Sequence, residues 1–451
     1  MFSSSWSIVG VSKDRFAGRM VGKHIPHIAI LIVVAILMAG SVQAQEASLA
    51  DADKQTIELL VRRIDQLEAR VAQLEAGKSQ PSGAKTDPAP TPQAEPATVG
   101  KEPPTEPTES QRLDVGTTLL NIRGFGDITF HGDTAKGGHF DPGIGTLAGN
   151  TTSFSLGQLD LFVTSDISDK FKFLSEIVFE AGLDNSFGVD VERYLLQYSP
   201  NDYFNVSVGR YHTALGYYNT AYHHSTWLQT TTGRPFLFAF EDSGGILPIH
   251  NVGVSVTGLI PSGDLGLHYV AEVGNGRASS SPNLEAVQNR VDENNGKSFN
   301  LALYVRPSAV RGLQTGFSVY HDHLTPIGLP NISENIFAVH AVFIRPSFEW
   351  LNETMLIRHA LNGTSRAFNT PGFYTQLSKR FGSYRPYFRY QYVNASDVEP
   401  VFPQVGLMRG PSFGLRYDPS ESVTLKLQYD YTDMRHQTPI NGVATQLGFT
   451  F

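Results

Sequence analysis

The residues best suited to chemistry gather in one long segment, 212–250. Its histidines and acids, among them His223, His224, Glu241 and Asp242, are of the types that bind zinc. Adjacent histidines would point in opposite directions on a strand, and the chain contains no His-Glu-x-x-His sequence that would place two of them on one helical face. The sequence therefore does not favour a metal site, and we expect no bound cofactor.

Two further enzyme interpretations fail on spacing. Ser225 directly follows His224, whereas a nucleophilic serine needs a histidine that is adjacent in space rather than in sequence. The Gly-Lys-Ser tripeptide at 296–298 resembles the end of a phosphate-binding loop, but Val291 occupies the position of that loop's first glycine. We therefore predict that the protein is not an enzyme.

A different group of charged residues lies near the C-terminal end of the chain. Its members alternate with apolar side chains, so in extended strands they would share one face. These residues are Arg380, Arg385, Arg389, Arg416 and Lys426, with Asp430 the acid among them. Guanidinium groups stay charged and form forked hydrogen bonds to carboxylates and phosphates. On neighbouring strands, these cations would form a basic wall suited to anions.

Apolar and polar side chains alternate with a period of two from Leu119 to Phe451. This alternation indicates the strands that could position the basic wall. In the segment 423–432, Val, Leu, Leu, Tyr and Tyr alternate with Thr, Lys, Gln, Asp and Thr. The segments 299–306 and 385–392 repeat this pattern. One face is apolar with aromatic residues near its ends and the other is polar, which is typical of strands that face lipid on one side.

Turn residues divide this region into sixteen segments. Short connectors are predicted at 165–170, 199–202, 261–264, 306–312, 345–347, 381–384 and 418–421, and longer loops at 131–150, 181–188, 212–250, 275–297, 322–334, 360–371, 394–410 and 433–441. Alternating short turns and long loops are typical of outer-membrane barrels, with the short turns in the periplasm. The predicted fold is all-β: a 16-stranded antiparallel transmembrane β-barrel preceded by a short coiled-coil helix and a Pro-rich linker.

The first 44 residues have the features of a secretory signal peptide. Four basic residues between positions 13 and 23 precede an apolar run of 12 residues at 28–39. That run is too short for a membrane-spanning helix, which needs about 20 residues. Small residues up to Ala44 then provide a cleavage site. We expect export to the cell outer membrane; the alternative is a buried core helix.

A heptad repeat follows within residues 45–77. Apolar residues fill positions a and d over three heptads: Ile57, Leu60, Ile64, Leu67, Val71 and Leu74. β-Branched residues at a with leucine at d favour a dimer on the simplest rule. The segments 63–68 and 70–75, however, resemble the Arg-h-x-x-h-Glu motif (h, apolar) of short trimeric coiled coils. We therefore expect a homotrimer, with a lone amphipathic helix as the alternative.

Residues 78–112 have the composition of a linker. Eight prolines lie between positions 81 and 107, and Val99 is the one large apolar residue there. Such a segment cannot bury enough apolar surface to offset the entropy of ordering it. The predicted organisation is a signal peptide (1–44), a periplasmic coiled-coil helix (45–77), a Pro-rich disordered linker (78–112) and an outer-membrane barrel (113–451).

The composition excludes several classes of protein. There is no cysteine, so disulfide frameworks, thiolate zinc sites and iron–sulfur clusters are ruled out. The net charge of −8 argues against binding nucleic acid, which requires a basic surface. Charged residues make up 17% of the chain, against roughly 25% in soluble domains, as expected when much of the surface faces lipid.

Three parts of the chain resemble known outer-membrane proteins. The final strand ends in Phe451 after outward-facing apolar residues, like the C-terminal signal read by the outer-membrane assembly machinery. The segment 206–217, VSVGRYHTALGY, resembles a strand end of phosphate-selective-type porins, with Ala214 where those relatives usually carry Pro. The coiled coil and spacer are similar to those of trimeric dicarboxylate-channel porins. The resemblance implies a sixteen-stranded trimeric porin in outer-membrane lipid; it does not identify a solute.

A sixteen-stranded barrel is too wide to be filled by its own side chains, so it either conducts or is plugged. Our first hypothesis is a water-filled channel for passive diffusion of small hydrophilic solutes. The alternative is a non-conducting structural barrel that tethers the outer membrane to the cell wall.

The longest loop, 212–250, is the third long loop, which in porins folds inward and narrows the pore; packing on the barrel rim is the alternative. Inward folding would place Glu241 and Asp242 opposite the basic wall and create a transverse field. We expect a mild preference for anions, which these two acids oppose.

Overall fold

The computed structural model describes residues 112–115, 118–134, 139–141, 145–147, 153–181, 186–222, 226–239, 245–278 and 292–451. These residues belong to one compact unit, 103–451. The predicted signal peptide, the coiled-coil positions, the linker and the two loop acids at 241 and 242 lie outside the described residues.

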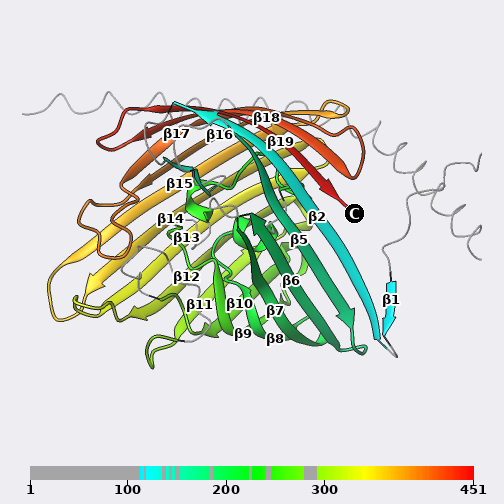
Figure 1. Ribbon diagram of the computed structural model, residues 1–451. Coiled ribbons are helices and arrows are strands. Elements are labelled where there is room, and N and C mark those ends of the chain that lie inside the picture. Colours follow the sequence, from blue (N-terminus) through cyan, green and yellow to red (C-terminus); the bar gives the residue numbers. More distant parts are fainter. Residues whose placement is uncertain are drawn as a thin grey trace, which may run out of the picture. The chain divides into compact units, whose positions relative to one another are not determined.

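Sixteen antiparallel strands close into a barrel (Figure 1). In chain order they are β2 (Thr118–Asp133), β5 (Ser153–Asp166), β6 (Phe171–Ala181), β7 (Phe187–Asn201), β8 (Phe204–His212), β9 (His250–Ile260), β10 (Leu267–Gly274), β11 (Ser298–Val305), β12 (Leu313–Leu324), β13 (Ile332–Arg345), β14 (Phe348–Leu361), β15 (Ala367–Lys379), β16 (Tyr384–Asn394), β17 (Leu407–Tyr417), β18 (Val423–Met434) and β19 (Ile440–Thr450). The last strand pairs with the first, with Leu447 opposite Ile128. This closure confirms the predicted barrel and its strand number.

Smaller elements accompany the barrel. Strand β1 (Arg112–Val115) pairs with the start of β2, while β3 (His139–Asp141) and β4 (Gly145–Leu147) form a separate hairpin. The helix α3 (Tyr218–Ala221) and the turn η1 (Phe236–Phe238) lie between β8 and β9; η2 (Gly263–Leu265) and η3 (Ser308–Val310) lie in short turns. Among the residues that the structure describes, no helix is long and apolar enough to cross a membrane.

Long and short connections alternate around the barrel, as the turn residues predict. We name three of the long ones: L3 (213–249), L4 (275–297) and L7 (395–406). At the opposite end, β7 and β8 are joined by residues 202–203, and β13 and β14 by 346–347. The barrel therefore has a long-loop end and a short-turn end.

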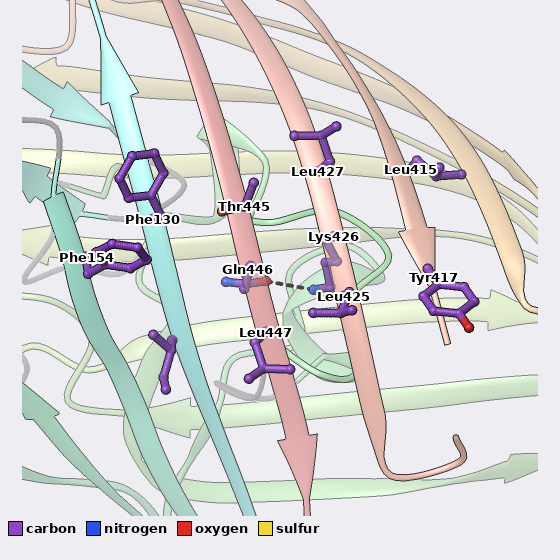
Figure 2. A pocket seen from close by; sticks show the side chains of 11 residues that line it. Phe130, Phe154, Leu415, Tyr417, Leu425, Lys426, Leu427, Thr445, Gln446 and Leu447 are labelled. Atoms are coloured by element: carbon purple, nitrogen blue, oxygen red, sulfur yellow. Dashed lines mark hydrogen bonds between the residues drawn. The ribbon is translucent and has the colours of Figure 1, made fainter. Parts of the chain in front are cut away.

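The outer face of the strands carries large apolar side chains. Leu425 is 45% exposed and Leu427 52%, whereas Lys426 between them is 3% exposed and faces inward. A shallow groove of about 440 Å³ on this outer face lies around Thr445, between Phe130 and Leu427 (Figure 2). An apolar surface of this kind is stable when lipid covers it.

The inner face differs from the polar face that the alternation predicts. On β13 and β14, Ile336, Val342, Leu351 and Met355 point inward and are buried, and they form one apolar cluster with residues of L3 such as Leu237. An apolar inner wall would be unfavourable beside water. It is stable here because L3 covers it.

Candidate functional site

The described residues of L3 lie inside the barrel rather than on its rim. The backbone of L3 is hydrogen-bonded to inward-facing side chains of β14, β16, β17, β18 and β19. Phe236, Leu237 and Phe238 of η1 are all buried. The described part of the loop therefore lies within the lumen, against the inner wall formed by β14 to β19.

Three buried or half-buried cations hold the middle of this loop. Arg389 Nη1 donates to the carbonyl of Gly233 at 2.8 Å and to Thr231 Oγ1 at 3.1 Å. Arg416 Nη1 donates to the carbonyls of residues 227 and 229, at 2.8 and 2.9 Å. Lys426 Nζ donates to the carbonyls of residues 226 and 231, at 2.5 and 2.8 Å. Each cation thus binds at least one carbonyl of the loop, and Arg416 is in addition paired with Asp418 at 2.7 Å.

Two of these cations, Arg416 and Lys426, form a row with Arg385 across neighbouring strands. Arg385 lies opposite Arg416, and Arg416 lies opposite Lys426. Figure 2 shows the hydrogen bond of 2.9 Å from Lys426 to Gln446 on the adjacent strand β19. Like charges directly opposite one another destabilise a sheet. The loop carbonyls and the carboxylate of Asp418 offset this repulsion, which favours the position of L3 against this wall.

Two carboxylates on β14 hold the first part of L3. Glu353 accepts hydrogen bonds from the backbone N–H groups of Tyr217 and Tyr218, at 2.6 and 2.9 Å. Glu349 accepts from Thr230 Oγ1 at 3.1 Å and from Tyr222 Oη at 3.4 Å. Burial, and secondarily the charge of Glu349, raises the pKa of Tyr217 to about 12. The tyrosine hydroxyls of this loop therefore remain protonated donors.

Glutamines complete the attachment of the loop. Gln391 Oε1 accepts from the N–H of Phe236 at 3.0 Å, and Gln428 Oε1 accepts from the N–H of Thr232 at 3.1 Å. Gln446 Nε2 donates to the carbonyl of Thr232 at 3.1 Å. Because buried backbone groups need partners, these side chains make the inward position of L3 compatible with its polar backbone.

The opposite part of the inner wall is built from paired charges. Arg193 Nε lies 2.6 Å from Glu176 Oε2, and His212 Nε2 lies 3.9 Å from the same oxygen. His250 Nε2 lies 2.6 Å from Glu192 Oε2. All three are strand-to-strand contacts among β6, β7, β8 and β9. On this wall, charge is compensated within the sheet itself.

Loops L4 and L7 are also fixed from within. His359 on β14 bonds through Nε2 to Glu334 at 2.8 Å and through Nδ1 to Glu399 of L7. Glu399 in turn accepts from the N–H of Val401 at 2.9 Å. Arg277 of L4 lies 3.6 Å from Glu334. This buried cluster joins two long loops to the barrel wall.

Within the predicted basic wall, the two arginines nearest the short-turn end form no hydrogen bond with L3 among the described residues. Arg380 is exposed, and its Nε donates to the carbonyl of Gly382 at 2.8 Å. Arg385 is half-buried and donates to Ser378 Oγ and to the carbonyl of Pro346. The acid Asp430 accepts from Ser412 rather than pairing with a cation. Of the basic wall, these arginines are the part that L3 leaves uncovered.

A second group of cations borders a cavity of about 420 Å³ at the short-turn end. Arg306 Nε donates to Gln314 Oε1 at 2.8 Å, and its guanidinium lies 5.0 Å from the centre of the Tyr304 ring. Arg311 and Tyr217 of L3 line the same cavity. Sequence reasoning did not select Arg306, although it occupies an inward position in the alternating segment 299–306.

Other residues that hold L3 were also missed. Glu349, Glu353, Gln391 and Gln428 were not selected as site residues, although each lies at an inward position on its strand. The signal that could have identified them is the alternation itself. The alternation predicts which side chains face the lumen, but it does not predict which of them a loop will contact.

Two short sequences typical of enzyme sites occur within strands. The Gly-x-Ser-x-Gly sequence at 410–414 lies in the middle of β17, whereas a nucleophile elbow needs a strand-to-helix turn. His321 and His323 flank an inward-facing aspartate on β12. Among the described residues, no group of three or more histidines and acids is arranged to hold a metal ion.

The sequence matches no protein-family model, and a comparison with curated proteins finds no match. The fold, by contrast, is similar to those of solved outer-membrane proteins. An anion-selective porin from Comamonas acidovorans is 12% identical, with a TM-score of 0.51 over 74% of this chain and 100% of that one. The outer membrane channel DcaP of Acinetobacter baumannii is 12% identical, with a TM-score of 0.50 over 74% and 97%.

Salmonella typhi OmpF, in a complex with daunomycin, is 10% identical, with a TM-score of 0.52 over 76% of this chain and 100% of that one. At such identities the likeness shows the fold of a porin-like barrel.

Proposed function

We propose that the protein is an outer-membrane porin, a water-filled channel for passive diffusion of small hydrophilic solutes. The observation that carries this proposal is the closed sixteen-stranded barrel with L3 held inside its lumen. A barrel of this width leaves space beyond its own side chains, and an inward loop sets the size limit of such a space. The porins that share the fold support the same function.

A mild preference for anions is part of the proposal. Arg306, Arg311, Arg380 and Arg385 lie at the short-turn end, and among the described residues none of them has a carboxylate within ion-pair distance. An anion entering the lumen would exchange part of its hydration for guanidinium donors. Glu241 and Asp242 of L3 oppose this preference, so the reversal potential in a salt gradient is the direct measurement.

We further propose a homotrimer in the outer membrane with its coiled coil in the periplasm. The heptad residues at 57–74 would raise the local concentration of barrels and strengthen contacts made elsewhere. Deleting residues 45–77 should weaken the trimer but leave the barrel folded. Native mass spectrometry that shows only monomers of the full mature chain would contradict this proposal.

A second candidate is a closed structural barrel that tethers the membrane. It is favoured by the burial of inward-facing groups along the path of L3: Glu353 is 1% exposed, Arg389 2% and Lys426 3%. In this view L3 is a plug rather than a constriction, and the lumen does not conduct.

Planar-bilayer recording separates the two candidates. The purified mature chain should produce discrete conductance steps if L3 is a constriction. A protein that shows the heat-modifiable gel mobility of a folded barrel but no conductance would instead be the structural barrel. Gel mobility that boiling does not change, without a β signature in circular dichroism, would contradict both.

A further inference from the structure

We propose that the outer face of β12 to β15 binds the phosphate group of an anionic lipid, through a polar row centred on Arg358. The proposal rests on the membrane location inferred above, but not on whether the barrel conducts. These four strands lie side by side in the sheet (Figure 1).

The polar row is made by strand register. His321, Asn335, Arg358 and Asn369 are direct cross-strand neighbours on β12, β13, β14 and β15. All four alternate with inward-facing buried residues, so they point away from the lumen. His321 Nδ1 lies 3.0 Å from Asn335 Oδ1, and Arg358 Nη1 donates to Asn369 Oδ1 at 2.9 Å. The row thus consists of two hydrogen-bonded pairs on adjacent strands.

The next row toward the short-turn end is apolar. It consists of Val319, Phe337, Leu356 and Pro371, and the first three are large side chains, each more than a third exposed. An arginine immediately above such a row can extend its guanidinium to the membrane interface while its stem remains over apolar surface. The polar row therefore marks one boundary of the lipid-facing band.

The height of this boundary agrees with a membrane. Trp350 faces outward at the short-turn end of the same strand, eight positions before Arg358. Eight residues at about 3.4 Å each span about 27 Å along the strand. With a tilt of about 40°, this is about 20 Å across the membrane, close to the apolar band of about 25 Å found in outer-membrane barrels. Arg358 is then at headgroup level in the leaflet that faces the long loops.

Charge on Arg358 is not balanced within the protein. Among the described residues, no carboxylate lies within ion-pair distance of its guanidinium, and the partner it does have is a neutral amide. Arg409 provides the contrast: it also faces outward near the long-loop end, but it is paired with Asp433 at 2.7 Å on the adjacent strand. One outward arginine is neutralised by the sheet, and the other is presented to the membrane.

The donors fit a phosphate. A guanidinium can give two parallel hydrogen bonds to phosphate oxygens, while the side-chain amides of Asn335 and Asn369 provide further N–H donors on both sides. The phosphate monoester of a lipid carries the negative charge that would balance Arg358. The acyl chains of the same lipid would lie on the adjacent apolar row. Free phosphate offers the same oxygens without the chains.

The test is native mass spectrometry of the detergent-purified full mature chain, with added phosphatidic acid, with phosphatidylcholine of the same chains, or with inorganic phosphate. Phosphatidic acid should bind about tenfold more tightly than phosphatidylcholine, as expected for a charge-assisted forked contact. Arg358→Gln should remove most of this difference, and Arg358→Lys should retain part of it. Arg409→Gln is the matched control and should leave the preference within about twofold.

Equal binding of the two lipids by the unmodified chain would overturn the proposal, and that comparison needs no variant to fold. An Arg358→Gln protein with unchanged preference would overturn it as well. Displacement of phosphatidic acid by an equal concentration of inorganic phosphate would assign the row to a soluble anion and not to lipid. Heat-modifiable mobility and bilayer conductance, measured on the same preparations, test the proposed porin separately.

Discussion

The two inner walls of this barrel carry similar charged residues and use them differently. On β16, β17 and β18, cations such as Arg389 and Lys426 bind backbone carbonyls of L3. On β6 to β9, Arg193 and His250 bind carboxylates of other strands of the same wall. The first wall is completed by a loop, and the second is complete in itself.

This difference has an electrical consequence. A carbonyl stabilises a cation but does not cancel its charge, so Arg389 keeps its positive charge under L3, whereas Arg416 is also paired with Asp418. The carboxylates of Glu176 and Glu192 do cancel the charge of their partners. Removing L3 should therefore expose a basic surface on one wall and leave the other nearly neutral.

The largest effect is expected from replacing residues 226–238 with a short Gly-Ser linker. This change removes every carbonyl that Arg389, Arg416 and Lys426 bind within L3 and uncovers the apolar cluster beside them. Single-channel conductance should rise severalfold, and the reversal potential in a KCl gradient should move toward that of chloride. Unchanged conductance from a barrel with normal heat-modifiable mobility would show that L3 does not limit the pore.

The wall on β6 to β9, whose charges are paired within the sheet, should be more sensitive to a single substitution than the wall that L3 completes. Glu176→Gln removes the fully buried carboxylate that pairs with the largely buried Arg193, and breaking a buried pair in this way typically costs about 3–5 kcal/mol. The midpoint of heat-induced unfolding in detergent should fall accordingly. Asp166→Asn breaks the exposed pair with Lys172 and is the control, with an expected loss of about 0–1 kcal/mol. Equal losses in the two variants would contradict the contrast.

The wall completed by the loop should respond more moderately. Lys426→Met removes charge-assisted hydrogen bonds to two L3 carbonyls, each worth about 1.5–3 kcal/mol, but also removes a buried charge that needs solvation. We expect a net loss near the lower end of that range, together with noisier channel currents as residues 226–231 are released. Thr424→Val is the matched control on the same inner face, because its buried hydroxyl has no hydrogen-bond partner among the described residues. If the Lys426→Met protein is as stable as the unmodified chain and its channel current is no noisier, the lysine does not anchor the loop.

The sequence was sufficient to predict the barrel because alternation and turn residues are local. The predicted turn at 306–312 separates β11, which ends at Val305, from β12, which begins at Leu313. The inward direction of Arg385, Arg389, Arg416 and Lys426 was predictable for the same reason, since side chains on a strand alternate between two faces.

The partners of those cations were not predictable. Arg389 and Gly233 are 156 positions apart, and nothing in either segment encodes their contact. The burial of the apolar inner residues of β13 and β14 could not be predicted either. An apolar residue gives the same sequence pattern whether lipid or a loop covers it. Placement of a long loop is decided by tertiary contacts, and the period of a strand carries no information about them.

The smallest effect, and the most specific, is expected from Arg385→Ala. Arg385 belongs to the same row as Arg416 and Lys426 but forms no hydrogen bond with L3 among the described residues. Its loss should leave the loop in place and change only the potential of the lumen. One charge at about 4 Å in water-like surroundings is worth about 1 kcal/mol, which limits the change in chloride-to-potassium permeability to about fivefold.

The reversal potential should accordingly shift toward that of potassium in Arg385→Ala, at nearly unchanged conductance. Adding Arg389→Ala should increase the shift and also disturb the current, because Arg389 anchors L3 whereas Arg385 does not. Arg358→Gln removes an equal charge from the outer face and should leave selectivity as it was. If Arg385→Ala and Arg358→Gln shift the reversal potential equally, the effect is one of total charge, and the uncovered end of the basic wall does not set selectivity. If the unmodified channel prefers potassium, the acids of L3 outweigh the wall, and the proposed preference for anions is wrong.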